Sequence, residues 1–224
     1  MRRILLSLVA FAVAGCNTDI TDCCSLGAHP SFRIVNAFTT PVTVTMDGKL
    51  VATIPAGFID TIPAATGNHS LALRSTTLPA NLSMPFTTTA GLNTMALTRS
   101  SNGDIISSQL DDTNSVVPAG ATKLRIIHLA PNAGTLQVYR TQPDYQTPIA
   151  WQVPFDYQTD ISSITAPFLQ STAGTWEVHI WQTPADASGW SNAPVKVLIP
   201  LSSGEKRTIL MLDKAGGGVR VQIL

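Results

Sequence analysis

The chain has few residues whose types and spacing could carry out chemistry. Its 224 residues include three cysteines and four histidines, the usual candidates for a nucleophile, a general base or a metal ligand. The nucleophile pattern Gly-x-Ser-x-Gly, the zinc pattern His-Glu-x-x-His and the calcium pattern Asp-x-Asp-x-Asp-Gly do not occur in the sequence. We therefore predict a protein that is not an enzyme, with no catalytic residue, no bound metal and no cofactor.

Two histidines keep one enzymatic alternative open. His128 and His179 fall on expected strands in the second half of the chain, where an envelope hydrolase could use either as a general base. A serine and an acidic residue would have to reach that histidine in the fold. In the alternative without catalysis, His128 is a half-buried strand residue that hydrogen-bonds to the turn after it.

The most specific chemistry belongs to Cys16. Arg2 and Arg3 precede an unbroken apolar stretch that ends in small residues directly before this cysteine, a layout typical of a secretory signal peptide. It resembles the lipobox of bacterial lipoproteins. That resemblance implies cleavage between Gly15 and Cys16, a diacylglycerol on the Cys16 thiol and usually an acyl chain on its new amino group. An ordinary signal peptide and an uncleaved membrane helix are the alternatives, although the stretch is short for a bilayer about 30 Å thick.

The lipobox resemblance implies a bacterial cell-envelope protein whose first partner is the lipid bilayer, bound through acyl chains on Cys16. Removing Arg2 and Arg3 from the 14 basic residues leaves 12 against 14 acidic ones, with no basic cluster. This balance argues against nucleic acid as a partner. Asn17, not aspartate, follows Cys16, and by the same resemblance this favours the outer membrane, with either face left open.

The other two cysteines, Cys23 and Cys24, lie before the first expected strand. A disulfide inside the folded part of the chain is therefore excluded. An intermolecular disulfide through Cys23 or Cys24, or no role at all, is favoured over a redox pair. The reason is that adjacent cysteines lack the Cys-X-X-Cys spacing of thiol oxidoreductases.

The elements that must position these residues are predicted to be β-strands. Short runs of Val, Ile, Leu and Thr alternate with Gly, Pro, Asn and Asp turns throughout the chain. The pattern also repeats, because residues 33–37 return as 125–129 and residues 65–73 return as 172–180. Each copy has roughly seven short strands at the spacing of a β-sandwich.

The second copy carries two insertions relative to the first. One falls around residues 140–150, where the first copy has only a tight hairpin turn at Asp47-Gly48, a favoured type I′ pair. The other falls around residues 182–194. The three glycines over residues 216–218 are expected to form the hairpin turn before the last strand.

Residues 125–139 carry a family resemblance. An arginine, two branched residues and a histidine are followed by a turn of sequence Ala-Pro-Asn-Ala and a strand that ends on Tyr139. With Gly-Thr-Trp-Glu-Val over residues 174–178, this opening resembles the bacterial envelope family known as domain of unknown function 4397. The resemblance covers about residues 31–224 and is weaker in the first copy, where Asn36 replaces the histidine. It implies an immunoglobulin-like sandwich, often in tandem on exported proteins, and no catalytic residues.

We therefore predict two tandem immunoglobulin-like antiparallel β-sandwich domains that follow a signal peptide and a short tether. The predicted boundaries are a signal peptide over residues 1–15, a lipidated tether over 16–30, a first domain over 31–113, a linker over 114–121 and a second domain over 122–224.

Aromatic residues are concentrated in the second copy, which holds all four tryptophans and all three tyrosines. Strand alternation directs Trp176, Val178 and Ile180 toward the core and leaves residues 177, 179 and 181 on the other face. Trp181 aligns with Arg74 of the first copy, and both are expected to face water. The predicted binding surface for a glycan or an envelope protein consists of exposed residues of the second copy: Trp181, Trp190, Tyr145, Glu177 and His179.

The leading functional hypothesis is a non-enzymatic binding or structural module of the cell envelope, with the first copy as a spacer. In the alternative interpretation of the aromatic residues, Trp181 and Trp190 cover each other or pack against the first copy. A structural assembly subunit without a ligand and an envelope hydrolase are the two other functions that stay open.

Overall fold

The computed structural model describes residues 31–79, 82–89, 92–99, 104–110, 116–141, 148–158, 166–182 and 193–224. The predicted signal peptide and tether, with Cys16, Cys23 and Cys24, lie outside these residues, as do Tyr145 and Trp190. No helix in the described part of the chain is long and apolar enough to cross a membrane.

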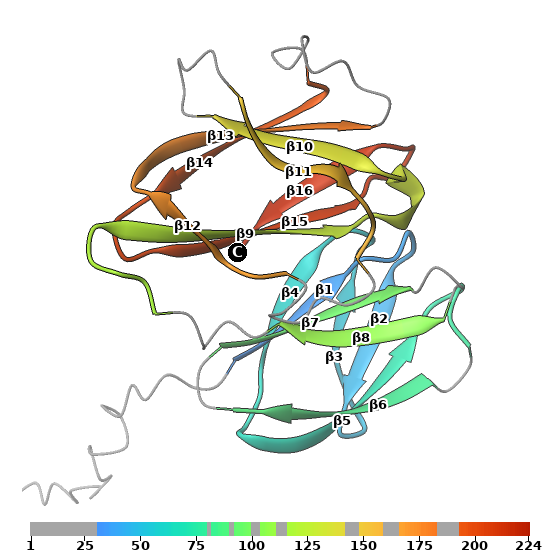
Figure 1. Ribbon diagram of the computed structural model, residues 1–224. Helices are drawn as coiled ribbons and strands as arrows, with labels where there is room; N and C mark the ends of the chain where they lie inside the picture. The colour runs from blue at the N-terminus through green and yellow to red at the C-terminus, as the bar shows by residue number, and fades with distance from the viewer. Residues whose placement is uncertain are drawn as a thin grey trace, which may run out of the picture.

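The described residues form two successive groups of eight strands (Figure 1). The first group consists of β1 (Ser31–Asn36), β2 (Val42–Met46), β3 (Lys49–Ile54), β4 (Ile59–Pro63), β5 (Gly67–Arg74), β6 (Leu82–Thr88), β7 (Leu92–Arg99) and β8 (Ile105–Leu110). The second consists of β9 (Ala121–Leu129), the 3-10 turn η1 (Pro131–Ala133), β10 (Leu136–Thr141), β11 (Ile149–Phe155), β12 (Leu169–Thr172), β13 (Gly174–Gln182), β14 (Val195–Leu201), β15 (Lys206–Asp213) and β16 (Val219–Ile223).

Each group builds one sandwich of two four-stranded sheets, and the two sandwiches have the same strand order. Sheets β4-β1-β7-β8 and β3-β2-β5-β6 form the N-terminal sandwich, whereas β12-β9-β15-β16 and β11-β10-β13-β14 form the C-terminal one. Every strand of the first copy thus has a counterpart eight strands later, as the sequence repeat predicts. The all-β fold of two tandem sandwiches is confirmed.

The strand arrangement differs in detail from the prediction. Each sandwich has eight described strands where the sequence indicated about seven, and each contains one parallel pair, β1 with β7 and β9 with β15, among antiparallel neighbours. Immunoglobulin constant domains place their first, second, fourth and fifth strands in one sheet. Here the first and fourth strands lie in one sheet and the second and fifth in the other, so the sandwich architecture is shared and the strand order is not.

Two turns predicted from glycine positions have the expected backbone. Asp47 and Gly48 connect β2 to β3 with φ values of 49° and 80°, the pair of positive angles that a type I′ turn requires. Gly216, Gly217 and Gly218 all have positive φ and connect β15 to β16. Because glycine adopts such angles at little cost, and Asp more readily than most other residues, these residues favour both hairpin turns.

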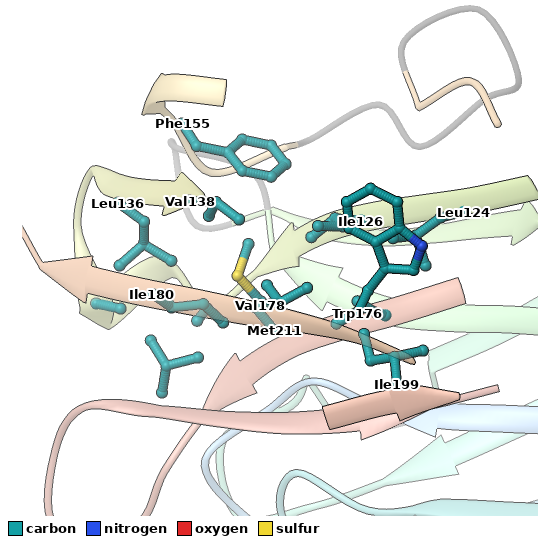
Figure 2. Close-up of a cluster of buried hydrophobic side chains, with 14 of the residues drawn as sticks. Leu124, Ile126, Leu136, Val138, Phe155, Trp176, Val178, Ile180, Ile199 and Met211 are labelled. Atoms are coloured by element: carbon teal, nitrogen blue, oxygen red, sulfur yellow. The ribbon is translucent and has the colours of Figure 1, made fainter. Parts of the chain in front are cut away.

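Each sandwich has its own hydrophobic core between its two sheets. In the C-terminal sandwich, alternate residues of β13 point inward, and Trp176 lies between Ile126 of β9 and Ile199 of β14 (Figure 2). The predicted inward face of this strand, formed by Trp176, Val178 and Ile180, is therefore confirmed. The N-terminal core is built in the same way around the stacked rings of Phe32 and Phe86, whose centroids lie 4.3 Å apart.

A third apolar cluster lies between the two sandwiches. Sheet β4-β1-β7-β8 faces sheet β12-β9-β15-β16 (Figure 1), and the residues that meet there point away from both cores. The buried members of this interface cluster are Val35, Ala37, Ala96, Leu110, Ile127, Leu129, Ala166, Leu210 and Leu212. The central strands β1, β7, β9 and β15 are consequently covered on both faces.

Polar and aromatic contacts join the sandwiches around this cluster. The Tyr157 hydroxyl, just after β11, hydrogen-bonds to the Thr98 hydroxyl and to the backbone carbonyl of Arg99, and it accepts a 3.1 Å hydrogen bond from the Arg99 backbone N–H. On the other side, the Arg220 guanidinium lies 3.5 Å above the ring of Phe58. The linker is thus one of several connections, and we expect the two sandwiches to move as one body.

Candidate functional site

His128 is a structural residue. It is fully buried; its Nε2 donates to the Gly134 carbonyl at 2.8 Å and its Nδ1 accepts from the Ala130 backbone N–H at 3.2 Å. Both ring nitrogens therefore hold the turn that follows β9. The interpretation of His128 as a strand residue bonded to this turn is confirmed, although the side chain is more deeply buried than predicted.

Asn36 performs the same task in the N-terminal sandwich. Its Oδ1 accepts from the Phe38 backbone N–H at 3.0 Å, two residues ahead, as His128 accepts from Ala130. Its Nδ2 donates to the Thr40 carbonyl at 3.0 Å, as His128 donates to Gly134. The asparagine that weakens the resemblance in the first copy thus holds the equivalent turn, and its Nδ2 also lies 3.0 and 3.1 Å from the carbonyls of Ile54 and Pro55.

Arg125, the residue with which the family resemblance begins, is also buried. Arg125 is fully covered on the face of β9 that points to the other sandwich, where its Nε and Nη2 donate to the Thr208 hydroxyl at 3.2 and 3.0 Å. Its guanidinium also lies 4.2 Å above the Phe168 ring. Both polar residues that carry the family resemblance therefore stabilise the fold and are not exposed for catalysis or binding.

The predicted aromatic surface on β13 is buried. Residues 177, 179 and 181 do share the outer face of the strand, but Trp181 is only 8% exposed and His179 only 2%. Tyr139 on the neighbouring strand contributes to this burial, because it pairs with His179 and packs edge-to-face against Trp181 at 5.4 Å. The prediction that Trp181 and His179 face solvent is wrong, whereas Glu177 stays partly exposed, 3.2 Å from His179.

We expect Trp181 to contribute to stability. The variant Trp181→Ala should lower the free energy of unfolding by about 3 kcal/mol, because it removes a large buried aromatic side chain. Arg74→Ala is the matched control, since Arg74 occupies the equivalent position of β5 and is exposed. Urea denaturation measures both; equal, small effects of the two variants would contradict the burial of Trp181.

The two insertions of the second copy begin at opposite ends of one strand pair. β10 and β13 are antiparallel, and the register sets Leu136 against Gln182 and Thr141 against Glu177. The first insertion follows Thr141, whereas the second follows Gln182, five residue steps away. At about 3.3 Å a step, their starting points are roughly 17 Å apart. The register thus gives no support to a single surface that contains both Tyr145 and Trp190.

A different feature of the C-terminal sandwich has the properties of a binding site. A cleft of about 530 Å³ opens at the end of this sandwich where β10, β12 and β13 meet the turn before β9. We call it the Arg140 cleft. Its lining consists of Pro118, Ala119, Gly120, Ala121, Arg140, Gln170, Ser171, Thr172 and Trp176.

The Arg140 guanidinium is held between two indole rings at this cleft. It lies 4.8 Å from the centroid of Trp176 and 5.1 Å from that of Trp151, within cation–π range of both. Its Nη1 donates to the hydroxyl of Ser171 on β12. Trp176 is fixed in turn, because its Nε1 donates to the Thr172 carbonyl at 3.0 Å.

Strand alternation explains why an arginine points into the sandwich here. Arg140 follows Leu136 and Val138 on the inward face of β10, at the end of the strand where the core opens. The repeat sets it against Met46 of β2, which packs on the N-terminal core. The first copy thus closes this position with an apolar side chain and the second with a cation.

No acid neutralises this cation within the described part of the chain. Arg140 forms no ion pair with any residue described, and burial lowers the pKa of its guanidinium. The site therefore presents a positive charge beside the indole of Trp176 and the exposed side chains of Gln170 and Thr172. No side chain in the described lining of the cleft titrates near neutral pH.

Sequence reasoning overlooked Arg140, although a signal for it exists. The hydrophobic alternation of β10 continues from Leu136 and Val138 directly to the arginine, which predicts a cation at a core position. As for metals, no group of three or more His, Cys, Asp or Glu residues that could hold an ion occurs among the described residues.

Comparison with known families agrees with the resemblance seen in the sequence. The model of the family described as domain of unknown function (DUF4397) matches residues 30–139, which cover the N-terminal sandwich and the start of the C-terminal one up to β10. The resemblance to this family is confirmed. No curated protein has a sequence that matches the chain.

Two solved structures illustrate how distant the structural likenesses are. A product complex of SpuA, a multi-modular glycogen-degrading pneumococcal virulence factor, has 10% sequence identity and a TM-score of 0.28 over 80% of this chain. A leucine-rich repeat protein from Bacteroides thetaiotaomicron has 12% identity and a TM-score of 0.20 over 80% of this chain. The chain spans only 20% and 25%, respectively, of these two proteins.

Proposed function

We propose that the chain is a non-enzymatic, glycan-binding lipoprotein of the bacterial cell envelope that binds its ligand in the C-terminal sandwich. The Arg140 cleft carries this proposal. Its volume of about 530 Å³ lies in the usual range of ligand sites, and it combines an aromatic wall, one cation and several exposed polar groups. Acyl chains on Cys16 attach the protein to the outer membrane in this proposal.

The rigid pairing of the sandwiches supports a role in presentation. The interface cluster and the Tyr157 contacts fix the C-terminal sandwich on the N-terminal one, so the first copy serves as a stiff spacer between the lipid anchor and the cleft. Tyr145 and Trp190 are proposed as two separate further contacts, because the insertions that hold them begin at opposite ends of the β10–β13 pair. A hydrolase is a weaker proposal, because His128 uses both ring nitrogens on backbone groups and His179 is buried.

A glycan array with the full-length lipoprotein in detergent micelles tests the proposal. We expect the wild type to bind a defined set of glycans, and Arg140→Met to weaken that binding at least tenfold, which corresponds to about 1.4 kcal/mol. Methionine is the matched replacement, because Met46 fills the equivalent position of the N-terminal sandwich. Arg74→Ala, on the outer face of β5, is the control and should bind as the wild type does.

Two outcomes would contradict the proposal. Absence of binding to every glycan, together with capture of an envelope protein in a pull-down, would assign the chain to protein recognition. Glycan binding that Arg140→Met leaves unchanged would remove the Arg140 cleft from the function. In that case Trp190→Ala and Tyr145→Ala test the two insertions separately.

A further inference from the structure

We infer that the glycan bound in the Arg140 cleft is acidic and that its carboxylate binds the guanidinium of Arg140. This inference rests on the proposed glycan-binding function and adds the class of ligand. It is carried by three features of the cleft: a cation without an acidic partner in the described residues, a guanidinium held in one orientation, and polar groups beside it.

The first feature is the charge itself. A half-buried guanidinium loses hydration, and burial lowers the pKa of Arg140 because the charged form is disfavoured. Packing does not require this charge, since the N-terminal sandwich uses Met46 at the same place. An anion that enters the cleft recovers the lost interaction energy of the cation, which a neutral ligand does not.

The second feature is the fixed orientation of the guanidinium. The guanidinium carbon lies 5.1 Å from the ring centroid of Trp151 and 4.8 Å from that of Trp176. The hydroxyl of Ser171 accepts a hydrogen bond from Nη1. Ser171 is the one side chain that accepts from Arg140 among the residues the structure describes. A pre-oriented fork of N–H donors matches the two oxygens of a carboxylate, and little side-chain entropy remains to be lost on binding.

The third feature is what surrounds the cation. Gln170 and Thr172 on β12 are exposed at the cleft and offer amide and hydroxyl groups to sugar hydroxyls. The turn over residues 118–120 also lines the cleft. The indole of Trp176 lines the cleft beside the guanidinium, so a sugar ring has an apolar surface to pack on. The charge of the sugar is thus placed at Arg140 and its hydroxyl groups at β12.

Matched pairs of glycans test this inference with the full-length lipoprotein. Each pair consists of a carboxylate-bearing oligosaccharide, such as a uronic acid oligomer or a sialylated glycan, and its methyl ester or neutral counterpart. We expect the wild type to bind the acid at least tenfold more tightly than its neutral partner in 20 mM NaCl. The preference should shrink in 500 mM NaCl, because salt screens a partly exposed ion pair.

Two variants of Arg140 separate charge from packing. Arg140→Met should weaken binding of the acid at least tenfold and abolish the preference, so that the acid and its neutral partner bind with equal affinity. Arg140→Lys keeps the charge but lacks the planar fork, so we expect it to retain only a small part of the preference. Thermal melting serves as the folding control, and both variants should melt within a few degrees of the wild type.

The possible failures are distinguishable. If acid and ester bind equally, or if Arg140→Met keeps the preference, the inference is overturned while the glycan-binding function stands. If sulfated glycans bind in place of carboxylated ones, the carboxylate assignment is overturned. If no glycan of any charge binds, the proposed function itself fails, and this inference fails with it.

Discussion

Replacement of Leu210 by aspartate should split the thermal unfolding of the protein into two transitions. Leu210 is fully buried in the interface cluster and points away from the core of its own sandwich. An aspartate there places an unpaired charge between two apolar sheets, at a cost of about 3–5 kcal/mol. The sandwiches separate to hydrate the carboxylate, and each then unfolds with its own core. The wild type, with the interface intact, should unfold in one transition.

Differential scanning calorimetry measures this splitting, and two further variants make it interpretable. Val35→Asp introduces the same charge from the N-terminal side of the cluster and should give the same two transitions. Leu198→Asp is the control, because Leu198 on β14 is 59% exposed and the change leaves the interface intact. A single transition in Leu210→Asp, or the same splitting in Leu198→Asp, would contradict a stabilising interface.

The sequence predicts the sandwiches well and their pairing poorly. The alternation of hydrophobic residues and the internal repeat suffice to predict the strands and the two cores. A strand that is covered on one face has a hydrophobic residue at every second position. The strands at the interface between the sandwiches have a different sequence pattern. In β15 the run Ile209-Leu210-Met211-Leu212 has no polar alternation, and in β9 Ile126 and Ile127 are adjacent. Such runs indicate strands buried on both faces, and here the second cover is the other sandwich.

The candidate site could be predicted only in part for a related reason. Alternation identifies the face on which Trp181 lies, but what covers that face depends on Tyr139, which lies 42 positions earlier. The Arg140 cleft likewise joins residues from β10, β12 and β13, together with a turn before β9. Such contacts between distant segments arise from sheet order and register, which composition and periodicity do not specify.

The interface also limits where either sandwich can bind a ligand. The sheets β4-β1-β7-β8 and β12-β9-β15-β16 use their outer faces on each other, so neither outer face is available for a ligand. The remaining free surfaces are the other two sheets and the ends of the sandwiches. The C-terminal copy carries a cation, Arg140, near the end of β10. The N-terminal copy has Met46 at the equivalent position of β2.

Substitution of His128 is the second change from which we expect a large effect. His128→Ala removes both hydrogen bonds to the turn after β9, deletes a fully buried ring and leaves the buried Ala130 N–H without its partner. An unsatisfied buried group costs about 1–3 kcal/mol, so we expect the free energy of unfolding to fall by about 3 kcal/mol. His128→Asn should lose clearly less, because Asn36 makes the equivalent bonds in the N-terminal sandwich.

The contribution of His128 to the free energy of unfolding should also depend on pH. Nδ1 of His128 accepts from a backbone N–H, so the folded protein holds the neutral ring with its proton on Nε2. Burial lowers the pKa of His128, although the hydrogen bond to Gly134 opposes this shift. Below about pH 6.5 the unfolded chain therefore takes up a proton that the folded chain resists. The stability that His128 contributes is present above this pH and is lost as the pH falls through that range.

His69 works in the opposite direction and has to be separated from this effect. The hydrogen bond to Asp47 raises the pKa of His69, so its contribution to stability is present at low pH and is lost as the pH rises through the raised pKa. Urea denaturation of the wild type and of His128→Asn is measured between pH 5 and pH 8. The contribution of His69 cancels in the difference between their free energies of unfolding, because both proteins contain His69. The stability advantage of the wild type should shrink as the pH falls below 6.5. A constant difference across this range would mean that His128 titrates alike in the folded and unfolded chains, and its two backbone hydrogen bonds would then not fix the neutral ring.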